Sequence, residues 1–237
     1  MMFSFDPMYW LFLGPAMLLS LVATLMTKAT FAKYSKIRAA SGYTGAQAAR
    51  RMLDMQGAGD VAIEQVGGFL SDHYDPRTRT LRLSPDVYSS PSLSAIGVAC
   101  HEAGHALQDA THYAPLKLRS AMVPAAQFGS FASYIFILIG CMMSAGHGTV
   151  LVEIGIVLFS IAVLFSVVTL PVEWNASARA KELMVTSGIV SHDEQADAAK
   201  VLNAAFMTYL AAAITALLEL LYWLWKLGLI GGGRRRD

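Results

Sequence analysis

Residues 98–108 read VACHEAGHALQ and hold two of the chain's six histidines. His101 and His105 are four positions apart, so on a helix their side chains lie one turn apart on the same face. Glu102 follows the first histidine directly, and small residues fill most of the remaining positions. The spacing therefore predicts a helix that presents two imidazoles and a neighbouring carboxylate to one small cation.

Zinc suits this arrangement because it binds neutral imidazole nitrogens, and a catalytic zinc site has three protein ligands plus a water. The pKa of that water falls towards neutrality, so a carboxylate beside it can accept its proton. The pattern HExxH is typical of zinc metallopeptidases, although a pattern of three fixed positions also occurs by chance. We predict one Zn²⁺ bound by His101 and His105, with Glu102 as the general base.

The composition indicates a membrane protein. Of 237 residues, 55% are hydrophobic and 15% are charged, whereas an ordinary soluble domain is roughly 25% charged. The net charge of +1 gives no reason to expect a nucleic-acid partner, and the two cysteines, Cys100 and Cys141, suggest no disulfide framework. Four apolar runs are long enough to cross a bilayer of roughly 30 Å, at about 8–26, 122–143, 150–170 and 206–227.

These runs predict a mainly α integral membrane protein with four transmembrane helices and a small α+β catalytic domain. The lipid bilayer is an expected partner, and a homo-oligomer or a membrane-protein partner remains open. The predicted parts are a transmembrane anchor (1–27), the domain with the HExxH helix (28–121), a transmembrane helical hairpin (122–171), a helical segment (172–205) and a fourth transmembrane helix with a basic tail (206–237).

Capping patterns predict where two helices begin. Thr44 with Gln47 forms one capping box, and Ser191 with Glu194 forms another. The first of these helices should end near Gly57, because glycine commonly follows the last helical residue.

Two prolines predict further helix boundaries. Ser90 and Pro91 should cap and open the HExxH helix, which is expected to run to about Asp109. Pro171 should kink or end the third apolar helix, and the helix that follows should close at Gly188.

Residues 61–66 and 70–83 predict a short strand and a β-hairpin with a proline-containing turn. In the second arm of the hairpin, apolar and polar residues alternate. We therefore expect Leu81 to be buried and Thr80 and Arg82 to be exposed.

Positive charge sets the expected orientation. Asp6 is the charge before the first apolar run and lysines follow that run, so it is interpreted as an uncleaved anchor with the N-terminus outside. Residues 28–121 and 172–205 then lie in the cytoplasm, and they hold fourteen of the eighteen Lys and Arg residues. The tail 234–236 opposes this orientation. We expect a multi-pass protein of the plasma membrane with a cytoplasmic catalytic domain.

Two histidines leave zinc one protein ligand short. Glu173 follows the third apolar run closely and is expected on the same side of the membrane as His101. A glutamate oxygen suits zinc beside two histidines. The alternatives that stay open on the residues alone are Glu182, Glu194, His73, His112 and His192.

Four blocks together resemble the YugP-like family of neutral zinc metallopeptidases of bacterial membranes: 72–84, 101–108, 113–120 and 170–177. The resemblance extends over nearly the whole chain. It implies a gluzincin-type catalytic domain in which Glu173 is the third ligand, beside two histidines, and Glu102 is the base. By similarity to HtpX-like membrane proteases, it also implies that an outer strand near 78–83 lines the cleft and pairs with an extended substrate through Thr78, Thr80 and Leu81.

The chain departs from the gluzincin pattern at two positions. Many gluzincins have, four residues after the third ligand, an aspartate that orients a histidine ligand, whereas this chain has Ser177. Ser177 or Asn175 is expected to substitute, with Arg179 as a further contact of the site, because such partners tune metal affinity. Cys100 replaces an expected alanine and should be a small buried residue. The candidates for stabilising a transition-state oxyanion are Tyr74, Tyr209, His192 and Arg179.

The predicted function is hydrolysis of unfolded or membrane-associated polypeptides by an integral membrane zinc endopeptidase. A metal transporter is one rival, but the predicted spans offer only Glu153 and Glu219 as acidic residues. Intramembrane proteolysis is disfavoured because His101 lies about twenty residues from the nearest apolar run. A catalytically inactive, zinc-stabilised scaffold is the third rival, and the retention of Glu102 speaks against it.

Overall fold

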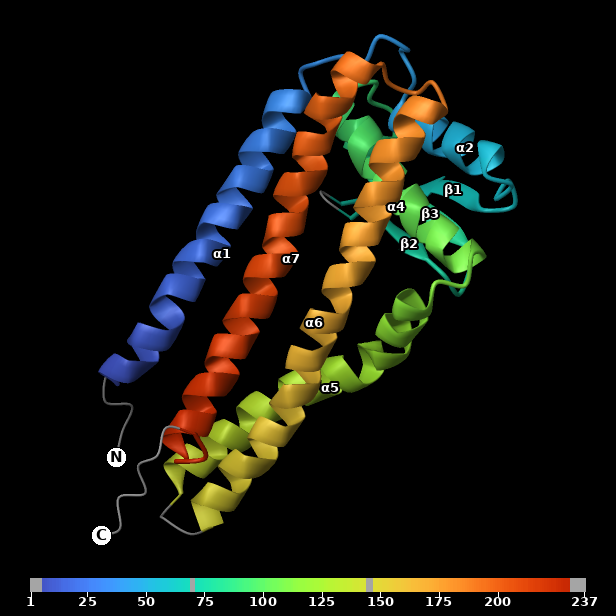
Figure 1. Cartoon of the computed structure of the whole chain (residues 1–237). Helices are drawn as coiled ribbons and strands as arrows, with labels where there is room; N and C mark the ends of the chain where they lie inside the picture. Colours follow the sequence, from blue (N-terminus) through green and yellow to red (C-terminus); the bar gives the residue numbers. More distant parts are fainter. Residues whose placement is uncertain (1–5, 69–70, 144–146, 231–237) are drawn as a thin grey trace. The chain divides into compact units, whose positions relative to one another are not determined.

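The structure is a computed structural model that describes residues 6–68, 71–143 and 147–230. In these ranges the chain is mainly helical and has one small sheet, as the sequence predicts (Figure 1). The helices are α1 (Pro7–Tyr34), α2 (Gly45–Met55), α3 (Pro85–Tyr88), α4 (Leu93–Ala110), α5 (Ala114–Met142), α6 (His147–Thr186) and α7 (His192–Lys226). The strands are β1 (Ala62–Gln65), β2 (His73–Asp75) and β3 (Thr80–Leu83).

Within the described ranges, four helices are long and apolar enough to cross a membrane, namely α1, α5, α6 and α7. They coincide with the four predicted apolar runs and indicate a multi-pass membrane protein. A span requires only about 20 residues. Because α6 has 40 residues and α7 has 35, both helices carry a polar segment in addition to an apolar one.

The chain forms two compact units. The membrane unit comprises residues 1–22, 118–170 and 209–237. The HExxH unit comprises residues 23–117 and 171–208, and it contains the sheet and α2, α3 and α4. The long helices therefore contribute different segments to each unit, and the division within α6 falls where the third apolar run ends.

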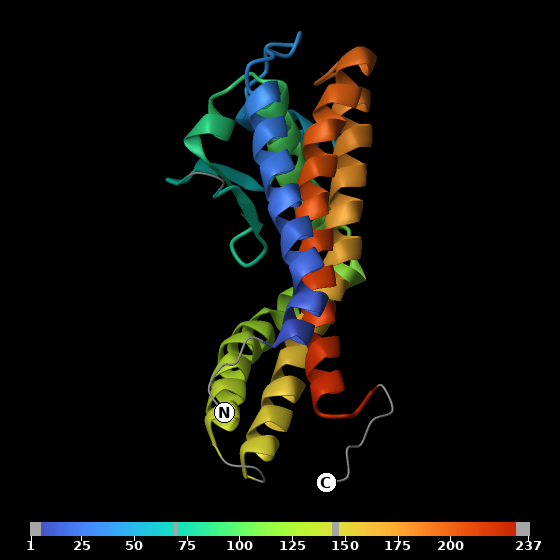
Figure 2. The same ribbon diagram turned by 90° about the vertical axis from the view of Figure 1, so that its left-hand side faces the viewer.

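Close helix pairs build the membrane unit. α1 packs along α7, and α5 packs along the first part of α6 (Figures 1 and 2). The hydroxyls of Ser20 and Thr215 lie 3.1 Å apart between α1 and α7. A Cβ at Gly155 of α6 would lie 2.6 Å from Ile137 Cγ1 of α5, so a larger residue would not fit. Small residues and polar contacts of this kind hold transmembrane helices together, since lipid removes the hydrophobic drive between them.

Both predicted capping boxes are present in the HExxH unit. The N–H of Thr44 donates to Gln47 Oε1 at 3.0 Å, and the N–H of Gln47 donates to Thr44 Oγ1 at 3.3 Å. Ser191 and Glu194 exchange the equivalent bonds at 2.9 and 3.3 Å. Gly57 follows the end of α2 with φ of +73°, a left-handed conformation that glycine adopts without strain. The predicted starts and stop of these helices are confirmed.

One apolar core holds α2, α4 and the polar end of α6 together. Its large, fully buried side chains include Met52 and Leu53 of α2, Ile96 of α4 and Met184 of α6. Burial of each such side chain contributes about 1.5–3 kcal/mol. Cys100 lies in the same core, as predicted for a small buried residue. This core fixes the orientation of the HExxH helix.

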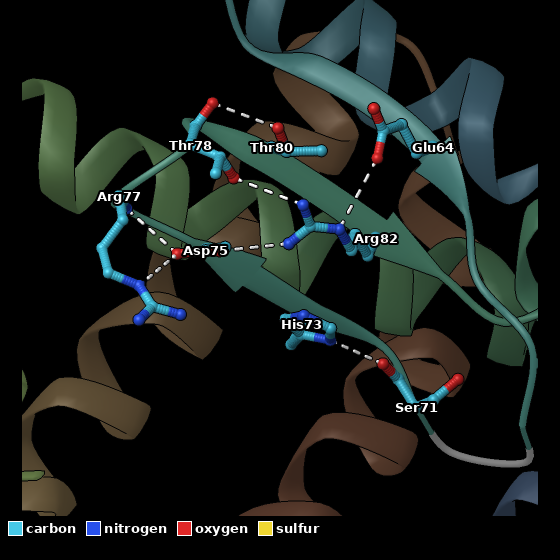
Figure 3. A network of polar contacts seen from close by, with 8 residues as sticks. All are labelled: Glu64, Ser71, His73, Asp75, Arg77, Thr78, Thr80 and Arg82. Atoms are coloured by element: carbon cyan, nitrogen blue, oxygen red, sulfur yellow. Dashed lines mark hydrogen bonds and ion pairs between the residues drawn. The ribbon is translucent and has the colours of Figure 1, made fainter.

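Charged pairs cross one face of the sheet, whose order is β1-β3-β2 (Figure 3). β2 pairs antiparallel with β3, which confirms the hairpin, and β1 pairs parallel with β3. Arg82 of β3 donates to Asp75 Oδ2 at 3.1 Å and lies 3.5 Å from Glu64 Oε2. Burial acts to raise the pKa of Asp75, but its bonds to Arg77 and Arg82 outweigh burial and lower the pKa to about 2. Cross-strand pairs of this kind stabilise a short sheet.

Two expectations for β3 are wrong. Thr80 is only 5% exposed and Arg82 is half-buried, although both were expected to be exposed. Neighbours in β1 and β2 flank both residues. β3 is also the central strand, so both of its edges already have hydrogen-bonded neighbours. Thr80 and Leu81 therefore have no free strand edge, whereas Thr78 lies in the turn before β3. The outer edges of the described sheet belong to β1 and β2.

Pro171 does not end the third apolar helix, because α6 continues through it to Thr186. A proline inside a helix costs about 3 kcal/mol. The buried residues Val172, Ala176 and Ala180 follow it, and their packing in the HExxH unit offsets that cost. The continuous helix carries the polar end of α6 along α4.

Candidate metal centre

α4 presents His101 and His105 on one face, as their spacing predicts. Their ring centroids lie 4.8 Å apart. The helix begins behind the N-cap Ser92, whose hydroxyl accepts a backbone N–H at 3.3 Å. The prediction that Ser90 caps this helix is wrong by about half a turn. The Ser90 hydroxyl instead donates to the Ser92 hydroxyl at 3.0 Å.

α6 approaches α4 closely at Gly104, between the two histidines. A Cβ at Gly104 would lie 2.7 Å from the carbonyl oxygen of Ala176, which is nearer than real Cβ atoms come. Ala176 follows Glu173 by about one helical turn. The glycine of the motif therefore permits the approach that brings the Glu173 face of α6 to the two histidines.

The three predicted ligands lie together. Glu173 Oε2 is 3.2 Å from His101 Nε2 and 3.4 Å from His105 Nε2. One potential ligand atom from each residue lies within 4.8 Å of the others. The carboxylate side chain is 1% exposed, and the imidazoles are 13% and 9% exposed. Among the residues that the structure describes, no second group of His, Cys, Asp or Glu has this spacing.

Glu102 is half-buried beside the two histidines. Burial raises the pKa of its carboxyl group; the charges of His101 and His105 act in the opposite direction, while those of Glu173 and Asp72 add to the rise. Burial acts to lower the pKa of His105, but the bond to Glu173 outweighs it, and the pKa is raised. A proton and a metal ion therefore compete for this imidazole.

Each histidine also has a partner at the ring nitrogen that faces away from Glu173. Ser177 Oγ lies 3.1 Å from His101 Nδ1, at the position where many gluzincins have an aspartate. Gln108 Oε1 lies 3.0 Å from His105 Nδ1. Sequence reasoning did not single out Gln108, although a residue three positions after a ligand lies on the same helix face and could have been considered.

Gln108 connects α4 to α6 through its amide nitrogen. Its Nε2 donates to the carbonyl oxygen of Val172 at 2.8 Å and to Asn175 Oδ1 at 3.0 Å. Arg179 Nε donates to the same oxygen of Asn175 at 3.0 Å. Asn175 and Arg179, both considered from the sequence, therefore reach His105 indirectly.

Comparison with known proteins agrees with this geometry. Residues 9–228 match the family described as "Putative neutral zinc metallopeptidase". The chain belongs to this family. The Bacillus subtilis (strain 168) protein "Putative membrane protease YugP" is 47% identical over 215 residues, which cover 90% of this chain and 94% of that protein. No solved structure matches the chain.

The donor set fits the zinc named in the family's description. Two imidazoles and one carboxylate form a common set for catalytic zinc. Both Nε2 atoms face Glu173, whereas both Nδ1 atoms contact an outer partner. This arrangement directs both Nε2 atoms to the place where a metal would sit and holds the rings through Nδ1.

The remaining candidates from the sequence do not join this group. Glu194 caps α7, and His73 Nδ1 lies 2.7 Å from Ser71 O (Figure 3). The Tyr74 hydroxyl donates to Asp109 Oδ2 at 2.9 Å. Tyr209 belongs to the membrane unit. The side chains that lie exposed are Glu182, His112 and His192.

Proposed function

We propose that the protein is an integral membrane zinc endopeptidase that hydrolyses unfolded or membrane-associated polypeptides. One observation carries the proposal: His101, His105 and Glu173 converge within 4.8 Å, directly beside Glu102. The family description and the name of the Bacillus relative support a zinc metallopeptidase of the membrane-protease type.

The chemistry follows from the positions of these side chains. His101, His105 and Glu173 would hold a zinc ion, which would supply a Lewis acid for the scissile carbonyl and a water of lowered pKa. Glu102 is placed to act as the general base that takes a proton during attack on the carbonyl carbon, and as the acid that returns a proton to the leaving amine.

A substrate strand is proposed to add to the outer edge of β2. The Tyr74–Asp109 bond ties this strand to the last turn of α4, the helix with the histidines. Main-chain pairing would bind an extended polypeptide with little side-chain selectivity. Charge supports a cytoplasmic HExxH unit, since its residues 23–117 and 171–208 hold thirteen of the eighteen Lys and Arg residues.

The rival functions gain no support from the molecule. Glu219 accepts a hydrogen bond from Tyr134 at 3.3 Å within the membrane unit, and Glu153 is exposed. Neither arrangement favours an ion path. An inactive scaffold would have no use for a half-buried carboxylate at Glu102.

The deciding experiment is Glu102→Gln, measured as hydrolysis of an unfolded protein by the detergent-purified chain with zinc quantified in the same sample. Turnover should fall by about 10²–10⁴-fold while zinc content stays at the wild-type level, because only proton transfer is lost. Glu182→Gln makes the same chemical change at an exposed position and should behave as wild type.

Unchanged hydrolysis in Glu102→Gln would remove this residue as the base. If the wild type and the variant both bind zinc and neither cleaves the substrate, the inactive scaffold becomes the better explanation.

A further inference from the structure

A chain of polar side chains runs from the surface of α6 to His105. It consists of Arg179, Asn175 and Gln108, and we refer to it as the amide chain. Gln108 is fully buried, whereas Asn175 and Arg179 are half-buried. Its three successive contacts, from Arg179 to Asn175, from Asn175 to Gln108 and from Gln108 to His105, are each 3.0 Å long.

The direction of each bond in the amide chain is determined by its neighbour. A guanidinium group only donates, so Asn175 must present its oxygen to Arg179. The Asn175 oxygen and the carbonyl oxygen of Val172 are both hydrogen-bond acceptors. Gln108 must therefore present its NH₂ group to both of them. The opposite orientation of either amide would place two donors or two acceptors against each other.

The remaining atom of Gln108 then decides the state of His105. Its amide oxygen, which only accepts, lies 3.0 Å from Nδ1. Nδ1 must therefore carry a hydrogen, and in the neutral ring Nε2 keeps its lone pair. Nε2 is the atom that faces Glu173.

We infer that Gln108 is a positioning residue of the metal centre: it fixes the tautomer of His105, and Arg179 fixes the orientation of Gln108 through Asn175. This inference rests on the proposed zinc site. It assigns to His105 an outer partner that the sequence did not single out. Partners of this kind typically change metal affinity by about 10–100-fold when they are lost.

The first test compares zinc affinities, measured by competition with a chromophoric chelator in detergent. Gln108→Ala should weaken zinc binding by about 10–100-fold, and Arg179→Met should weaken it by less. Arg179→Lys keeps a cationic donor and should restore part of the affinity that Arg179→Met loses. Glu182→Gln, on the exposed face of the same helix, is the matched control and should bind zinc as wild type.

The second test separates positioning from a general structural role. In the zinc-loaded chain with ¹⁵N-labelled histidine, the Nδ1–H of His105 should give a ring signal that is protected from solvent exchange. Gln108→Ala should remove that protection and leave the signal of His101 in place. If Gln108→Ala fails to fold, Asn175→Asp and Asn175→Leu replace it: aspartate keeps acceptor oxygens for both donors, and leucine keeps none.

Two outcomes would overturn the inference. One is wild-type zinc affinity in Gln108→Ala, or in Asn175→Leu if that variant replaces it. The other is weakened affinity with an unchanged, protected ring signal, which would indicate a structural role only. Neither readout is peptide cleavage, so a chain that binds zinc as described but cleaves nothing contradicts the proposed function alone.

Discussion

The two histidines of the site have different surroundings, although they lie one turn apart on the same helix. His101 is the more exposed, at 13%, and its Nδ1 meets the hydroxyl of Ser177. His105 is 9% exposed, and its Nδ1 meets the fully buried amide of Gln108. A hydroxyl can donate or accept, whereas an amide oxygen only accepts. The tautomer is therefore determined at His105 and left adjustable at His101.

This difference predicts unequal tolerance to substitution. Water can reach a partly exposed ring and replace a lost hydroxyl, but it cannot readily replace three buried contacts of one amide. Removal of Gln108, the partner of His105, should therefore weaken zinc binding more than removal of Ser177, the partner of His101. Glu173 serves both sides, since one of its oxygens lies near both Nε2 atoms.

The largest effect is expected for Glu173→Ala, which removes the carboxylate that lies near both histidines. Zinc affinity should fall by more than the roughly 100-fold expected for loss of an outer partner, because a ligand itself is removed. Zinc content after dialysis against a weak chelator measures this loss. Glu182→Ala, on the same helix, is the control, and full zinc retention in Glu173→Ala would exclude Glu173 as a ligand.

A smaller effect is expected for Gly104→Ala, which should disturb both histidines together. Its Cβ would lie 2.7 Å from the carbonyl oxygen of Ala176 and would force α4 away from α6. Overpacking of this kind costs about 1–3 kcal/mol of stability, and zinc affinity should fall with it. Thermal unfolding in detergent and chelator competition measure the two quantities.

Gly97→Ala is the matched control for Gly104→Ala, since its Cβ would lie at an ordinary 3.5 Å from the carbonyl oxygen of Ala198. Alanine is the better helix former, so Gly97→Ala should be neutral or stabilising by up to about 1 kcal/mol. If the two variants behave alike, close approach at Gly104 does not position the site.

The smallest effect is expected for Ser177→Ala, which tests the His101 side alone. Zinc affinity should fall by about 10-fold or less, at the low end of the range for outer partners, because solvent can serve Nδ1. Ser160→Ala removes a hydroxyl of α6 that bonds only its own helix, at Ile156 O, and serves as control. If Ser177→Ala weakened zinc binding as much as Gln108→Ala does, the predicted difference between the partners of His101 and His105 would be wrong.

Features that depend on neighbouring residues could be predicted from the sequence. The capping boxes at Thr44 and Ser191 and the four apolar spans follow from local hydrogen bonding and from local hydrophobicity. Predictions were wrong where segments that are distant in the sequence pack against one another. β3 is central because β1 pairs with its second edge, and α6 continues through Pro171 because the turns that follow are buried.

By itself, the sequence determined that His101, Glu102 and His105 share one turn of a helix, because helical geometry makes that spacing local. Without the family resemblance, the residues left Glu173 among several candidate ligands, and nothing in the sequence indicated Gln108. Only the tertiary structure shows Glu173 and Gln108 in contact with the two histidines. Glu173 meets His101 across 72 positions of the chain, and Gln108 meets Asn175 across 67. Both contacts require the packing of α6 on α4 at Gly104, a distance between helices that no local pattern specifies.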